Sequence, residues 1–285
     1  MTTNKTALVL GGGGHFGIAF ETGYLRGLND QQVDLRQAAT IMGSSAGSQV
    51  GAVMASTKSW AQIWHDQIEM DVDETTPISD SAMQQLFVQY NELPKVATSA
   101  RDWIDRLGAI SRATQKIIPA QARLAMIAKR IGDNVDWTDA LRIVATRVSD
   151  SKRVVFDRQS NVPLLKALAA SSALPGVWPA IEINGEFYYD GGSYSMDNPD
   201  LITDADQVVV IANNLPVQAP YQTADLVDQM NARGMKTTLI VPGEEVVGIL
   251  NKYQGNTMEA ALRGEVAQAA RRQGQLEAAA LKAQL

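Results

Sequence analysis

Short apolar runs and longer segments of helical spacing alternate along most of the chain. Seven runs rich in aliphatic and β-branched residues predict buried strands, at 6–10, 38–42, 141–146, 153–156, 186–189, 206–211 and 237–241. Apolar residues at helical spacing predict helices at 18–28, 49–55, 162–170, 225–232 and from about 257 to 285. This alternation is typical of α/β proteins. We therefore predict a single domain over 1–285, a three-layer α/β/α fold with a mostly parallel central sheet.

The pattern changes between residues 60 and 130, where helical spacing continues without a strand. Residues 66–80 carry six acidic side chains and no basic one, whereas 95–130 carry eight basic and two acidic side chains. We expect a helical insertion over about 60–130 that packs on the sheet with its basic face in solvent, or that lies in peripheral contact with an anionic membrane or covers a site, if the chain proves to hold one. The acidic group Asp71, Asp73 and Glu74 lacks the spacing of a calcium loop, so we interpret it as a solvated loop.

Composition narrows the class of protein. The chain has 285 residues, of which 45% are hydrophobic and 20% charged, as expected for a globular protein. It has no cysteine, which excludes disulfides, thiolate metal sites and cysteine nucleophiles, and its net charge of −6 argues against a nucleic-acid partner. No signal peptide or apolar run of membrane-spanning length is evident. We expect a cytoplasmic protein without a cofactor or metal.

A Gly-x-Ser-x-Gly motif follows the second predicted strand. Gly43 and Gly47 flank Ser45, so the strand can turn sharply into a helix and expose the serine at the apex. A helix that begins after Ser45 directs its positive end toward the serine oxygen. The simpler alternative is a glycine-rich turn with an N-capping serine.

A glycine-rich loop, 11–17, joins the first predicted strand to the first helix. Such a loop offers backbone N–H groups to a phosphate or an oxyanion. Gly12, Gly14 and Gly17 also match the dinucleotide fingerprint, which keeps a dinucleotide-binding oxidoreductase as an alternative. That fingerprint needs an acidic residue after the second strand, which here runs into Ser45 instead.

A nucleophilic serine needs a base, and the chain restricts the choice. Its two histidines are His15 and His65, so the hydrolase order of serine, acid and then histidine is excluded, although either histidine could reach Ser45 in space. A carboxylate acting directly is the simplest base that remains. Asp190 is the candidate because a strand precedes it and Gly191 and Gly192 follow it. We expect adjacent parallel strands to bring Asp190 beside Ser45, and partial burial to raise its pKa.

Three motifs in this order resemble those of the patatin-like phospholipase family: the loop 11–17, the serine motif 43–47 and Asp190-Gly191-Gly192. The segments 170–175 and Asn198-Pro199 are similar too, and the resemblance covers about 6–215. It implies hydrolysis of lipid acyl esters through an acyl-enzyme, with Ser45 as nucleophile and Asp190 as base. It also implies an oxyanion hole formed by the N–H groups of Gly12, Gly13 and Gly14.

One position departs from this family pattern. Many members carry arginine or lysine just before the last loop glycine, where this chain has Phe16. The missing cation makes a neutral acyl ester more plausible, so we expect the substrate to be a phospholipid, a lysophospholipid or a neutral acyl ester. His15 is interpreted as a surface or hydrogen-bonded residue rather than a third catalytic member. A non-catalytic lipid-binding protein of the same fold is the other alternative.

Overall fold

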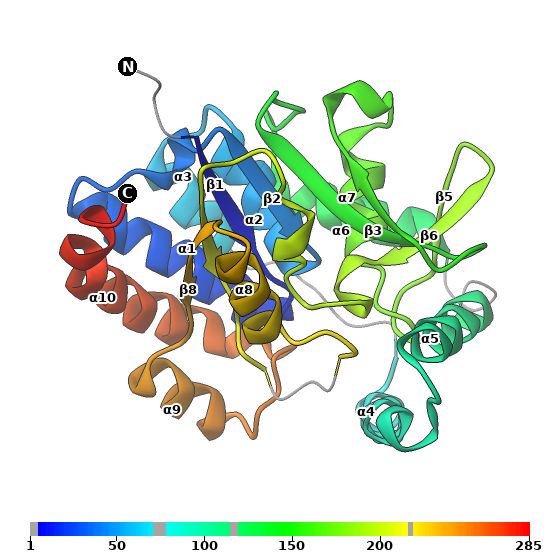
Figure 1. Cartoon of the computed structure of the whole chain (residues 1–285). Coiled ribbons are helices and arrows are strands. Elements are labelled where there is room, and N and C mark those ends of the chain that lie inside the picture. The colour runs from blue at the N-terminus through cyan, green and yellow to red at the C-terminus, as the bar shows by residue number, and fades with distance from the viewer. Residues whose placement is uncertain (1–4, 71–77, 115–118, 216–218) are drawn as a thin grey trace.

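The computed structural model describes residues 5–70, 78–114, 119–215 and 219–285, arranged around one mixed sheet (Figure 1). The strands are β1 (Thr6–Leu10), β2 (Thr40–Ser44), β3 (Leu141–Arg147), β4 (Arg153–Phe156), β5 (Ile181–Ile183), β6 (Glu186–Asp190), β7 (Gln207–Ile211) and β8 (Lys236–Ile240). The α-helices are α1 (Gly14–Asp30), α2 (Ala46–Ala55), α3 (Trp60–Trp64), α4 (Asp80–Val96), α5 (Ala100–Thr114), α6 (Ala120–Ile131), α7 (Leu164–Ser171), α8 (Thr223–Ala232), α9 (Glu244–Lys252) and α10 (Arg263–Lys282). Shorter turns are η1 (Leu35–Gln37), the π-helical η2 (His65–Glu69), η3 (Arg158–Ser160), η4 (Gly191–Ser193), η5 (Pro199–Leu201) and η6 (Ala260–Leu262).

The sheet has the strand order β5-β6-β3-β2-β1-β7-β8, with β4 also paired to β3. Strands β3, β2, β1, β7 and β8 are parallel, whereas β4, β5 and β6 pair antiparallel. The expectation that the strands of Ser45 and Asp190 are adjacent and parallel is therefore wrong, because β3 lies between β2 and β6. Strand β6 instead pairs antiparallel with β3 on one side and with β5 on the other, and the chain reverses from β5 into β6 in a hairpin turn at Asn184 and Gly185, both at positive φ.

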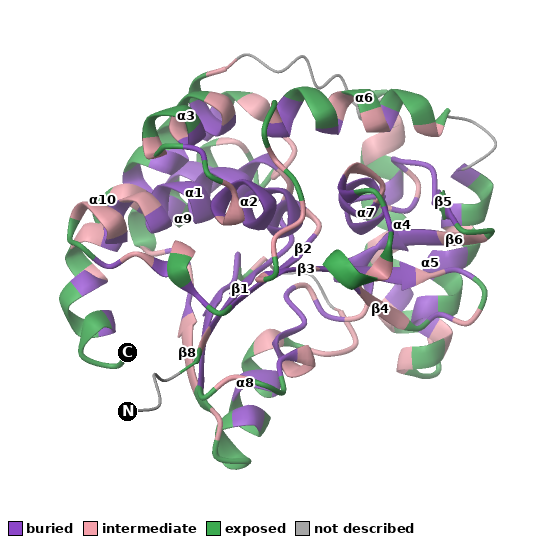
Figure 2. Ribbon diagram, turned by 90° about the horizontal axis from the view of Figure 1, so that it is seen from above, coloured by how far each residue is buried: buried purple, intermediate pink, exposed green. Residues whose placement is uncertain are grey.

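Alternate residues of the central strands face two different layers of helices, which confirms the α/β architecture. Leu8 and Leu10 of β1 pack into the larger core with the helices α1, α2, α7 and α10. Ala7 and Val9 face a smaller core that includes Val227 of α8. Figure 2 shows α8 alone on one side of the strands and α1, α2 and α10 on the other. The alternation follows from the two-residue period of a strand.

Helices α1 and α10 lie in close backbone contact. A Cβ atom on Gly27 would lie 2.1 Å from the carbonyl oxygen of Arg271. The C-terminal helix begins at Arg263 rather than near Thr257. Thr257 is held instead against the glycine loop, where its carbonyl oxygen accepts the N–H of Phe16 at 3.1 Å.

In its described residues the predicted insertion consists of the helices α3, η2, α4, α5 and α6 with short connections, and it contains no strand there. Figure 1 shows α4 and α5 at the same end of the sheet as β5 and β6. The acidic group Asp71, Asp73 and Glu74 lies outside the described residues. Within the described chain, no helix combines the length and hydrophobicity needed to cross a bilayer.

Candidate active site

Ser45 stands at a strained turn between β2 and α2. Its backbone angles are φ 52° and ψ −117°, which a non-glycine residue rarely adopts. A Cβ on Gly43 would lie 2.2 Å from the carbonyl oxygen of Gly47, and one on Gly47 would lie 2.3 Å from that of Leu10. Both motif glycines are therefore required by backbone contact. The Ser45 hydroxyl makes no capping bond to α2, so a simple N-cap does not account for it.

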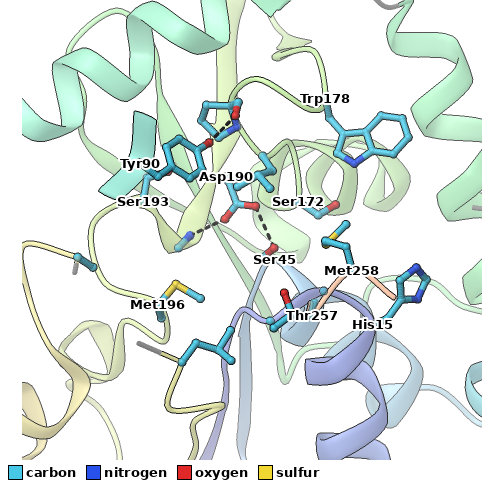
Figure 3. Close-up of a pocket in the computed structure, with 18 of the residues that line it drawn as sticks. His15, Ser45, Tyr90, Ser172, Trp178, Asp190, Ser193, Met196, Thr257 and Met258 are labelled. Carbon is cyan, nitrogen blue, oxygen red and sulfur yellow. Dashed lines mark hydrogen bonds between the residues drawn. The ribbon is translucent and has the colours of Figure 1, made fainter. Parts of the chain in front are cut away.

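The Ser45 hydroxyl donates instead to Asp190. The distance from Ser45 Oγ to Asp190 Oδ2 is 2.9 Å, and Asp190 Oδ1 accepts the N–H of Gly192 at 2.8 Å (Figure 3). Burial raises the pKa of Asp190 to about 6, against the opposing effects of the Gly192 N–H, the Ser45 hydroxyl and the positive charge of Arg123. A carboxylate with this pKa is ionised at neutral pH and is a better proton acceptor than an exposed aspartate.

Two further contacts hold the serine turn and the aspartate turn together. In the sheet, Ser44 lies opposite Val144 and Asp190 opposite the next residue, Ala145, so both strands end at the same level. Asn198 Nδ2 bridges the turns, donating to Ser44 Oγ at 2.9 Å and to the Gly191 carbonyl at 3.0 Å. This bridge gives the Asn198-Pro199 motif a structural reason.

The segment 170–175 meets the same turn from α7. Ser171 Oγ accepts the backbone N–H of Ser45 at 3.0 Å. Its neighbour Ser172 lines the pocket, where its hydroxyl accepts from Arg123 Nη2 at 3.0 Å. The sequence resemblance includes this segment, but it predicts neither the Ser171 contact nor the Ser172 contact.

The glycine loop lies against the serine turn but does not present all of its N–H groups. Gly47 N–H donates to the Gly11 carbonyl at 2.8 Å, and Gly12 N–H donates to the Met196 carbonyl at 3.0 Å. Because its N–H is already used, the structure argues against Gly12 as an oxyanion donor. Gly13 and Gly14 line the pocket beside Ser45, and no acceptor in the described part of the chain takes their N–H groups.

A pocket of about 210 Å³ opens over the Ser45–Asp190 pair. Most of its lining is apolar and comes from the insertion helices α4 and α5 and from segments after α7, β6 and α9: Phe87, Tyr90, Trp103, Leu107, Leu174, Pro175, Trp178, Met196 and Met258. Figure 3 shows Trp178 and Met258 on one side of the Ser45–Asp190 pair and Tyr90 on the other, beside Asp190. Such a lining suits a hydrocarbon chain placed against a polar reacting group.

Two arginines of α6 add cations to this pocket. Arg123 and Arg130 are both buried, and the Arg123 guanidinium lies 4.4 Å from the centre of the Trp178 ring. Their spacing of seven residues places them on one face of the helix. The sequence pattern indicates a solvated basic face, whereas the structure turns these two side chains inward.

His15 is buried beside these arginines. Its Nδ1 lies 3.3 Å from Arg130 Nη2, and burial, with the nearby charges of Arg130, Arg263 and Arg123, lowers its pKa to about 3. The ring is therefore neutral at physiological pH. A hydrogen-bonded histidine was one of the two expected states, and a surface position is excluded because only 2% of the residue is exposed.

Comparison with known proteins gives a family match and several structural likenesses. The model of a family described as patatin-like phospholipase matches residues 8–221. The chain is similar to VipD from Legionella pneumophila, at 12% identity and a TM-score of 0.44, over 88% of this chain and 55% of VipD. It is similar to the type III effector ExoU, at 19% identity and a TM-score of 0.46, over 99% of this chain and 53% of ExoU. It therefore spans about half the length of these structures. Among curated proteins no match is found.

Proposed function

Because the chain belongs to the patatin-like phospholipase family, we propose that it hydrolyses the acyl ester of a lipid with Ser45 as nucleophile and Asp190 as base. The observation that carries the proposal is the 2.9 Å hydrogen bond from Ser45 Oγ to Asp190 Oδ2 at the floor of an apolar pocket. A serine hydroxyl bonded directly to a buried carboxylate has the proton acceptor that nucleophilic attack requires.

The reaction follows from this placement. Ser45 Oγ attacks the ester carbonyl carbon while its proton passes to Asp190 Oδ2, and the carbonyl oxygen becomes an oxyanion. We assign its stabilisation to the N–H groups of Gly13 and Gly14 rather than to Gly12. Collapse of the tetrahedral intermediate expels the alcohol, which takes the proton from Asp190. A water molecule repeats both steps on the acyl-enzyme, releasing the fatty acid and restoring Ser45.

The pocket also favours one class of lipid. The apolar wall at Trp103 and Leu107 fits an acyl chain, and the guanidinium groups of Arg123 and Arg130 fit an anionic group on the same molecule. Of the three substrate classes left open by the sequence, we therefore propose a phospholipid or lysophospholipid rather than a neutral acyl ester.

Peripheral contact with an anionic membrane through 95–130 stays a prediction. Three basic side chains in the described part of this segment are already paired with carboxylates: Lys95 with Glu92, Arg101 with Asp105, and Arg106 with Asp102. With Arg123 and Arg130 also buried, less positive charge faces solvent than the sequence indicates.

The proposal is tested by active-site labelling and turnover. Purified protein is treated with a fluorophosphonate, and the adduct is located by peptide mass spectrometry, alongside hydrolysis of a soluble p-nitrophenyl ester and a lysophospholipid. We expect one adduct, on Ser45, and a loss of roughly 10³-fold or more in kcat for Asp190→Asn. Asp204→Asn, at an exposed aspartate paired with Arg142, is the matched control and retains full activity. Wild-type protein with neither label nor turnover, or an active Asp190→Asn variant, contradicts the proposal.

A further inference from the structure

Asn213 follows β7 and is buried behind the glycine loop, outside the Ser45–Asp190 pair. We propose that Asn213 is a positioning residue that sets the direction of the Gly13 N–H toward the oxyanion. The inference rests on the proposed function, since it concerns the oxyanion hole of that reaction. No sequence motif singled out this asparagine.

Asn213 holds the peptide between Gly12 and Gly13. Asn213 Nδ2 donates to the Gly12 carbonyl oxygen at 2.8 Å. The described chain has no cis peptide bond, and in a planar trans peptide the C=O and the following N–H point in opposite directions. A Gly12 carbonyl held toward Asn213 therefore turns the Gly13 N–H away from it. Gly13 lines the pocket that holds Ser45, so this is the direction of the reacting ester.

The orientation of the Asn213 amide is itself fixed by its neighbours. Its Nδ2 also donates to Glu21 Oε1 at 3.2 Å, and Glu21 is fully buried on α1. The Gly12 carbonyl oxygen can only accept, so only the NH₂ group can face it, and Glu21 Oε1 accepts from the same NH₂ group. Rotation of the amide would place its oxygen against the Gly12 carbonyl oxygen. Glu21 thereby fixes the Asn213 NH₂ group, which in turn fixes the Gly12 carbonyl.

The glycine loop leaves space for the Asn213 amide. A Cβ on Gly13 would lie 3.0 Å from Asn213 Cγ, and a Cβ on Gly17 would lie 2.9 Å from Asn213 Nδ2. Any side chain at Gly17 would therefore press on the amide. The last glycine of the loop motif has a structural purpose here that differs from binding a phosphate: it admits Asn213.

The experiment compares Asn213→Asp with Asn214→Asp. The two changes are chemically identical at adjacent positions, but Asn214 is exposed and its positive φ of 46° tolerates aspartate. Two inhibitors are used: an alkyl trifluoromethyl ketone, which forms a tetrahedral oxyanion on Ser45, and the matching alkyl alcohol, which occupies the pocket without one. Asn213→Ala is the second variant, because aspartate at 213 adds a carboxylate beside Glu21 and can prevent folding.

We expect kcat for the p-nitrophenyl ester to fall about 10- to 100-fold in the Asn213 variants, with KM unchanged, because a misdirected oxyanion donor affects only the transition state. Affinity for the trifluoromethyl ketone falls in parallel, while affinity for the alcohol and all constants of Asn214→Asp stay within twofold. A folded Asn213→Ala variant with wild-type kcat overturns the inference. Equal loss of both inhibitors, or failure of both variants to fold, shows a structural role and overturns it too. Failure of the proposed function itself is distinguishable, since wild-type protein then lacks turnover.

Discussion

At the residue scale, the proposed reaction depends on one carboxylate in an unfavourable environment. Asp190 is 4% exposed, and among its described hydrogen bonds its carboxylate oxygens accept only the Gly192 N–H and the Ser45 hydroxyl. The burial that raises the pKa of Asp190 to about 6 makes it a stronger base and also makes its ionised form less stable in the folded protein.

This pKa predicts the pH dependence of the reaction. In the proposed reaction only ionised Asp190 accepts the Ser45 proton, so kcat/KM is expected to fall about tenfold per pH unit below about pH 6 and to level off above it. The measurement is the pH profile of p-nitrophenyl ester hydrolysis between pH 4.5 and 8.5, with the spontaneous rate subtracted. A profile controlled instead by a group of pKa above 7 assigns the base to another residue.

At the scale of elements, close helix contact depends on glycines. Gly23 and Gly27 of α1 and Gly274 of α10 each face a backbone carbonyl of the opposite helix, with a Cβ on Gly23 only 2.3 Å from that of Ala267. Direct backbone approach lets α10 cover α1, which carries both the glycine loop and Glu21. The position of the loop therefore depends on a helix almost 250 residues later in the chain.

The change Gly27→Ala tests this contact. The new methyl group would lie 2.1 Å from the Arg271 carbonyl, so the helices must separate, and we expect a loss of about 1–3 kcal/mol in the free energy of unfolding. Gly264→Ala on α10 meets no atom within 4 Å and is expected to gain up to about 1 kcal/mol from helix propensity. Urea denaturation of both variants decides the point. Equal stability of the two variants would mean that the contact is not restrictive.

At the scale of the whole molecule, buried carboxyl groups set the pH dependence of stability. Burial raises the pKa of Asp197 to about 7, and burial together with Asp197 raises that of Glu21 well above its usual value. At neutral pH both groups bind more protons in the folded than in the unfolded protein. Their contribution to the free energy of unfolding is therefore lost as pH rises through their pKa in the folded protein. His15, with its pKa lowered to about 3, has the opposite effect, but only below its unfolded pKa of 6.5.

The free energy of unfolding is therefore expected to fall as pH rises from about 6.5 to 8. A carboxyl that is still protonated in the folded protein contributes a loss of about 1 kcal/mol per pH unit, and the contribution of Asp197 fades above its pKa of about 7. Asp197→Asn keeps the shape and removes the titration, and should flatten this slope. The melting temperature of both proteins across this range is the measurement. A wild-type melting temperature that rises toward pH 8 refutes the expectation.

The sequence by itself determined the local structure of this protein. Most strand and helix positions follow from apolar periodicity, although it does not predict β5 and α9. Gly43 is required by the backbone of Gly47, four residues later, whereas Gly47 is required by the backbone of Leu10 on another strand. The strand-end glycine turn at Asp190 and the family resemblance also predict that Asp190 pairs with Ser45. The predicted arrangement, with the two strands adjacent and parallel, is wrong. Local patterns suffice where the atoms in contact are close in the chain or the motif itself carries the constraint.

Only the tertiary structure decided which groups at the site are available and what surrounds them. The Gly12 N–H is taken by Met196, Arg123 and Arg130 turn inward, and Asn213 reaches Gly12 across 201 positions of sequence. Each depends on strand order and on which helix covers which loop. Those arrangements arise from packing of the whole chain, because the free energy of a buried contact depends on its spatial neighbours rather than on its neighbours in sequence.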